Sequence, residues 1–172
     1  MLSPKKLSEL WNRHSAALLL VARGHCGSVL PAFAEDCVQE AFVRLAALKK
    51  DPESAAGWLM ICVRNSAIDA VRSQLRRTKR EAAVAKCKPR WFQPNSDVVD
   101  SDHTQLQRTL SQLDQETRDI VIGHLWNDMT FRQLAEVVGL SSATVHRRYE
   151  DGIEQMRNLM TEPTPSNVEA AQ

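Results

Sequence analysis

The chain has 172 residues, of which 43% are hydrophobic, 25% charged and only 5% aromatic, enough apolar content for one ordinary domain or two small ones. This composition excludes collagen-like, wholly disordered and disulfide-scaffold proteins, and no apolar run approaches the roughly 20 residues that span a bilayer. The net charge of +1 is unevenly distributed: residues 1–95 hold 16 basic and 8 acidic residues, and residues 96–172 hold 6 basic and 13 acidic ones. We therefore expect two units with different partners, the first attracting a polyanion. A self-shielding protein with an acidic second half is the alternative.

Three amphipathic helices are expected in the first half. Apolar residues recur at helical spacing over 7–22, over 34–48, and from a cap at Ser54 to Leu75, with a bend expected near Asn65 and Ser66. The four cysteines fit no zinc-binding spacing, and for those within apolar helical patterns a buried free thiol is expected. Because the N-terminus leads into a polar helical pattern rather than an apolar leader, the expected location is the cytoplasm.

The second half begins after a segment without periodicity. Prolines, Asn95 and a run of Asp and Ser over residues 86–104 predict a flexible linker. Helical patterning resumes from Leu106 to Leu125, breaks at Asn127 and Asp128, and continues in two close helices over about 130–138 and 142–158. The tail, 161–172, is expected to be disordered. No strand-like alternation persists, so the predicted fold is all-α, with two small helical domains over residues 1–85 and 105–160.

The two closely spaced helices have the pattern of a helix-turn-helix. Thr130 and Ser141 can cap them, and Gly139 supplies a positive φ at the turn. This arrangement places its second helix in the major groove of DNA. The side chains expected to face DNA are polar and precede two acids; they are Ser142, Thr144, His146, Arg147 and Arg148. An ordinary helical hairpin with solvated charges is the alternative.

The third helix and the residues just after it are strongly basic. Residues 64–90 hold nine basic and two acidic residues, a density that supplies the sequence-independent part of nucleic-acid binding. Trp58 could stack on a base and Asn65 could read a base edge. Equally, Trp58 lies at helical spacing with core residues, and a basic helix can simply be solvated.

The second helix carries a polar stripe opposite its apolar face. Asp36, Gln39, Glu40 and Arg44 lie at helical spacing. This pattern suits docking to a protein partner, and a plain solvent face is the alternative. A helical metalloenzyme that uses Glu35 and nearby His25 with these acids is a third reading, although no Glu-x-x-His pattern accompanies them.

In this order, the features resemble bacterial RNA polymerase sigma factors of the extracytoplasmic-function (ECF) group, which keep only regions 2 and 4. The resemblance covers residues 7–158 and rests on the stretches 34–45 and 57–72, followed by the linker and the helix-turn-helix. It implies region 2 over 1–85 and region 4 over 105–160. Core RNA polymerase, through its β′ clamp helices and β flap, promoter DNA and an anti-sigma factor are the implied partners.

The resemblance assigns roles to particular side chains. It places the core-polymerase contact on the second helix, at Glu35, Asp36, Gln39, Glu40 and Phe42. It places recognition of the strand-separated −10 element at Trp58, Arg64, Asn65, Asp69, Arg72, Arg76 and Arg77. The duplex −35 element falls to Ser142, Thr144, His146, Arg147 and Arg148. The chain departs from the family pattern at Glu150, Asp151 and Ile153, positions at which relatives are often basic or otherwise non-acidic.

The expected function is therefore promoter-specific initiation of transcription rather than catalysis, with no cofactor and no metal. Extruding a base costs a few kcal/mol, which a binding pocket offsets, and stacking on an aromatic ring returns roughly 1–3 kcal/mol per base. Two weak readers joined by a linker gain through effective concentration when the polymerase holds them at the right spacing. A free-standing helix-turn-helix regulator that binds operator DNA without polymerase is the alternative.

Overall fold

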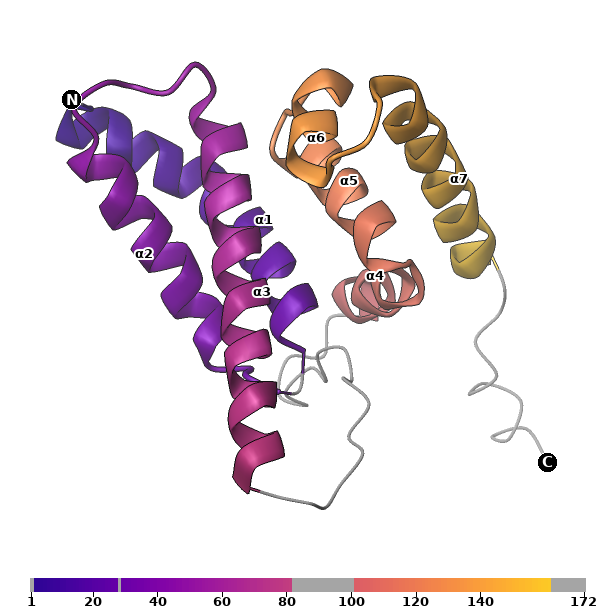
Figure 1. Cartoon of the computed structure of the whole chain (residues 1–172). Helices are drawn as coiled ribbons and strands as arrows, with labels where there is room; N and C mark the ends of the chain where they lie inside the picture. Colours follow the sequence, from indigo (N-terminus) through magenta and orange to yellow (C-terminus); the bar gives the residue numbers. More distant parts are fainter. Residues whose placement is uncertain (1, 28, 82–100, 162–172) are drawn as a thin grey trace.

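The computed structural model describes residues 2–27, 29–81 and 101–161, and within these ranges the chain forms seven α-helices and no strand (Figure 1). The predicted all-α, two-unit fold is confirmed. No helix in the described ranges is long and apolar enough to cross a membrane.

The first unit is a bundle of three helices: α1 (Pro4–Cys26), α2 (Phe33–Ala47) and α3 (Ala55–Glu81), each of which packs on the other two. Ser3 caps α1 by accepting from the Lys6 N–H, and α1 ends at Gly27, whose φ of 52° suits glycine. The expected cap at Ser54 is confirmed, because its Oγ accepts from the Gly57 N–H at 3.1 Å. Helix α3 continues without a break through Asn65 and Ser66, where a bend is expected, so the bend stays a prediction.

The second unit holds four helices: α4 (Ser101–Gln112), α5 (Gln115–Trp126), α6 (Phe131–Val138) and α7 (Ser142–Thr161). The single pattern over 106–125 is in fact two helices, because Asp114 caps α5 by accepting from the N–H groups of Glu116 and Thr117, both at 3.1 Å. Buried Arg118 closes the corner by donating to the carbonyl oxygens of Leu110 in α4, at 2.8 Å, and of Leu113, just after α4, at 2.7 Å.

The expected linker and tail lie largely outside the described residues. Of residues 86–104, only the last four are described, and they form the first turn of α4. Of residues 161–172, only Thr161 is described, at the end of α7. The domain boundaries therefore remain predictions.

The two units share one buried apolar cluster. Leu18, Leu45 and Leu59 represent it in the first unit, and Ile120 and Leu134 in the second. Helix α1 contacts α5, and α3 lies beside α6 (Figure 1), so the units pack face to face. Their functional surfaces must therefore be found on the outside of this pair or at the seam between its members.

Candidate polymerase and nucleic-acid interface

The outer face of α2 is polar and strongly acidic at its start. Glu35, Asp36, Gln39 and Glu40 are all exposed, and the first two lie in the first helical turn, where negative charge is favourable. Glu35 pairs with Arg23 of α1 at 3.4 Å, and Glu40 pairs with Arg44. Asp36 and Gln39 thus remain in water between two ion pairs.

Beside this acidic face runs an apolar groove of about 610 Å³ between α1 and α2. Phe42, predicted as a polymerase contact, is buried and packs edge-on against Trp11 with ring centroids 4.8 Å apart. Trp11 and Val43 are 39% and 68% exposed on the groove. Phe42 therefore supports the groove from below, and Val43 is an exposed apolar side chain of the groove that the sequence analysis did not name.

The predicted −10 side chains of α3 fall into two groups. Asn65, Asp69, Arg72 and Arg76 follow one another at intervals of three or four residues and are all exposed, so they share one outward stripe, which begins at the partly buried Trp58. Arg77, also exposed, flanks it. This stripe joins a stacking ring, an amide and cations on a single helix face.

Arg64 is separate from that stripe. It is rotated toward the second unit, where its Nε donates to Oδ2 of Asp119 at 3.1 Å and its side chain is only 18% exposed. Nε2 of His25 reaches the same oxygen at 2.8 Å. The third reading, in which His25 joins the α2 acids at a metal, is therefore wrong in geometry, and no group of three or more possible metal ligands occurs among the described residues.

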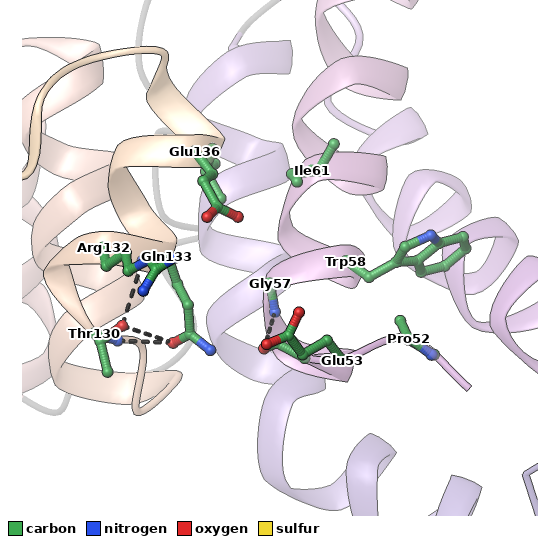
Figure 2. Close-up of a pocket in the computed structure, with 11 residues that line it drawn as sticks. Pro52, Glu53, Gly57, Trp58, Ile61, Thr130, Arg132, Gln133 and Glu136 are labelled. Atoms are coloured by element: carbon green, nitrogen blue, oxygen red, sulfur yellow. Dashed lines mark hydrogen bonds between the residues drawn. The ribbon is translucent and has the colours of Figure 1, made fainter. Parts of the chain in front are cut away.

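Trp58 lines a cavity of about 360 Å³ between α3 and α6 (Figure 2). The opposite wall comes from α6 and its cap, with Arg132, Gln133 and Glu136 (Figure 2). Trp58 also packs against the buried cluster. Its indole ring points away from α6 (Figure 2), so the ring belongs to the packing of the first unit, and its role in binding a base stays a prediction.

The predicted helix-turn-helix is formed by α6 and α7. Thr130 and Gln133 make a reciprocal capping box, Gly139 has φ 76° and ψ 28°, and Oγ of Ser141 accepts from the Thr144 N–H at 3.1 Å. Leu134 is fully buried. Two stable caps and a left-handed glycine thus fix the entry angle of α7.

The side chains predicted to face DNA differ in their freedom. Ser142, His146 and Arg147 are exposed on α7, whereas Thr144 is partly covered. Arg148 is held by Glu116 of α5, at 2.7 Å. Among the described residues Arg147 has no ion-pair partner, so it is the cation most available to a phosphate or a guanine.

An aromatic cluster supports the exposed start of α7 from beneath. His124 of α5 stacks on Phe131 with centroids 4.4 Å apart, and Phe131 meets both His146 and Tyr149. His146 also lies 3.4 Å from Glu150. Glu150 is therefore positioned to hold His146, one of the α7 side chains predicted to face DNA.

Comparison with known proteins finds two family models, one in each half of the chain. The family described as Sigma-70 region 2 matches residues 10–77, and Sigma-70, region 4 matches residues 103–156. The ECF RNA polymerase sigma factor SigK of Mycolicibacterium vanbaalenii is 24% identical over 137 residues, which cover 76% of this chain and 70% of that protein.

A solved structure resembles the whole arrangement. It is the sigma factor RpoE from Bartonella quintana in complex with the anti-sigma factor NepR, with a TM-score of 0.63 and 16% sequence identity over 91% of this chain and 97% of that one. At that identity the likeness speaks for the fold. With regions 2 and 4 matched in order over most of the sequence, the chain belongs to the ECF group of the sigma-70 family.

Proposed function

We propose that this sigma factor binds core RNA polymerase through the outer face of α2, opens and holds the −10 element on α3, and reads the −35 element with α7. The single observation that carries the proposal is the display of three separate polar faces on the helices matched by regions 2 and 4. The role is binding and strand separation, and no covalent step is required of any side chain. Its place of action is the cytoplasm, with the polymerase.

The polymerase contact is proposed for Asp36, Gln39 and Glu40, with the adjoining groove as an apolar complement. A face that is acidic at its rim and apolar at its side suits a partner with basic and apolar side chains. Val43 and Trp11, which are 68% and 39% exposed, lie together on the groove and give this face a contiguous apolar area for a partner to cover.

The −10 contact is proposed for the outward stripe of α3. Trp58 provides an aromatic face, Asn65 a base-reading amide, and Arg72, Arg76 and Arg77 bind the backbone of the separated strand. Each exposed arginine that neutralises a phosphate releases counterions, so binding falls with rising salt. Arg64 can join this group only when it is released from Asp119.

The −35 contact is proposed for the exposed start of α7. Ser142, Thr144 and His146 reach phosphates or base edges, Arg147 approaches the duplex directly, and Arg148 does so from its ion pair with Glu116. Because Glu150 lies on the same helix, it weakens nonspecific attraction to phosphate and leaves more of the affinity to specific contacts.

The test is transcription from a promoter by core polymerase with the purified full chain. Asp36→Lys should weaken core binding at least about tenfold, because an exposed acid at the centre of the contact is reversed. Glu9→Lys, which makes the same charge change on an exposed site of α1, is the matched control and should bind like the unaltered protein. A folded chain that never binds core, or an Asp36→Lys variant with unchanged affinity, would contradict the assignment.

The alternative of a free-standing regulator gains no support, since region 2 is matched as well as region 4. The complex of the structural neighbour with an anti-sigma factor supports a further proposal, that a partner of this kind also binds the present chain.

A further inference from the structure

The seam between the two units is held by ion pairs of one polarity. Its centre is the carboxylate of Asp119, which is fully buried and meets Arg64 at 3.1 Å and His25 at 2.8 Å. At its edge Arg13 of α1 pairs with Asp128 at 3.2 Å. In these three pairs the first unit provides the basic group and the second unit the acid. The opposite charges of the two halves of the sequence are therefore partly paired with each other at this seam.

Apolar contacts at the same seam are reciprocal. Met60 of α3 lies against Gly123 of α5, and Met129, just before α6, lies against Gly57 of α3: a Cβ built on either glycine would come within 3.6 Å and 3.7 Å of the opposing methionine. Both methionines are buried. Each unit therefore offers a flexible side chain to a gap in the other.

The seam also carries features that a permanent core would lack. Nδ1 of His14 donates to Oδ1 of Asn127 at 3.0 Å, yet Nδ2 of Asn127 is buried and finds no acceptor among the described residues. A cavity of about 360 Å³ remains between α3 and α6 (Figure 2). Separation would return each of these polar groups to water, so the seam is specific in geometry but releasable.

The dimensions of a promoter conflict with this closed arrangement. Elements centred at −35 and −10 lie about 25 base pairs apart, or about 85 Å of duplex at 3.4 Å per base pair. Helix α6 contacts α3 and also packs on α7. Helix α7 has 20 residues and is about 30 Å long. The recognition surfaces of α3 and α7 therefore cannot both reach their elements while the seam is closed.

We propose that the seam between α1–α3 and α5–α6 is an intramolecular latch, which keeps the free sigma factor closed and must open before both promoter elements are bound. The inference rests on the proposed function for its consequence, but the latch itself is independent of it. Asp119 acts as an internal competitor of promoter DNA, because it holds Arg64 away from the α3 stripe.

Asp119→Asn is the principal test, since it keeps the shape of the side chain and removes the charge shared by Arg64 and His25. It should shift the closed–open equilibrium at least about 100-fold toward the open form, because Arg64 loses its buried counter-charge and His25 loses the carboxylate that it bonds. Small-angle X-ray scattering of the full chain, without polymerase or DNA, should then show a larger radius of gyration. Glu154→Gln is the matched control: it removes an acid from an exposed site of α7 and should stay compact.

A second pair of variants, at the exposed Arg13–Asp128 ion pair, distinguishes opening of the seam from misfolding of the chain. Arg13→Glu should open the chain and Asp128→Arg in the same molecule should close it again, because the ion pair is restored with its polarity reversed. Circular dichroism should show equal helix content in all variants. A radius of gyration that is the same in Asp119→Asn, Arg13→Glu and the unaltered chain would overturn the latch.

The functional consequence is measured separately, as the concentration of sigma factor that half-saturates transcription by a fixed amount of core polymerase. Asp119→Asn should lower it about tenfold, because the binding-competent form is more populated. An open variant with an unchanged half-saturating concentration would overturn the gating role. If no variant supports transcription, the proposed function fails, and scattering still decides the latch on its own.

Discussion

The packing of α7 on α5 yields a sharp prediction at Gly152. A Cβ built there would lie 2.6 Å from Cγ2 of Thr117 and 3.2 Å from Cγ2 of Val121, whereas carbon atoms in contact are normally about 3.5–4.0 Å apart. Thr117 cannot rotate away, because its Oγ1 donates to Oδ2 of Asp114 at 2.6 Å and its side chain is β-branched. A methyl group at this position must therefore push α7 away from α5 by about 1 Å.

At an ordinary helical site, Gly→Ala stabilises by about 1 kcal/mol. Overpacking costs about 1–3 kcal/mol, and the 2.6 Å contact places Gly152→Ala in the upper part of that range, at about 2–3 kcal/mol. After the helical gain is subtracted, we expect a net loss of about 1–2 kcal/mol in the free energy of unfolding. Urea denaturation of the full chain, followed by circular dichroism, measures it. Thr117→Ser removes the clashing methyl and keeps the hydroxyl that bonds to Asp114, so the double variant should recover most of the loss. Stability equal to or above that of the parent, or a loss that Thr117→Ser does not change, would refute the reasoning.

Three further results are expected. Asp114→Ala should lower the unfolding free energy by about 1–2 kcal/mol at pH 7 through loss of the α5 cap. Burial raises the pKa of Asp114, but the hydrogen bonds from Thr117 and the nearby Arg148 outweigh burial, so the pKa is lowered on folding. The stability difference between Asp114→Ala and the parent, measured by urea denaturation, should therefore shrink as the pH falls below about 4 and the carboxylate becomes protonated. Gly139→Ala should cost about 1–2 kcal/mol in thermal unfolding, from the left-handed backbone alone, since nothing lies within 4 Å of its Cβ position. Arg147→Ala should reduce the salt dependence of duplex binding by about one unit of slope and leave unfolding unchanged, whereas Arg148→Ala should lower both affinity and stability in the same assays.

Local signals in the sequence were sufficient for the helices and for much of the site. Caps at Ser54, Thr130 and Ser141 and the glycine at 139 act within one turn of the backbone, so their effect can be read from neighbouring residues. Asp114 was missed as a helix start because the apolar period continues through it. Most of the residues predicted for the α2 face and for α7 are exposed, but Phe42 is buried and Thr144 and Arg148 are partly covered; the roles of all of them stay predictions.

The seam could not be predicted, because its partners are distant in the chain. His25 and Asp119 are separated by 94 positions, and no local pattern pairs them. The opposite charges of the two halves were the one available signal, and they suggested external partners first. The separation of Arg64 from Asn65 was, by contrast, accessible. Asn65 precedes Arg72 by seven residues, about two full turns, and so lies on the same face, whereas Arg64 precedes Asp69 by five residues and is rotated from it by more than a third of a turn.

Arg118 has a mechanical consequence for any opening of the molecule. Arg118 projects from α5, and its guanidinium donates to the carbonyl oxygens of Leu110 and Leu113, at the end of α4. Burial lowers the pKa of Arg118, and these hydrogen bonds are kept. Helices α4 and α5 should consequently move as one rigid body, together with α6 and α7, which pack on α5. The arrangement of α6 and α7 is thus set before any contact with DNA, and it stays the same whatever the position of the first unit.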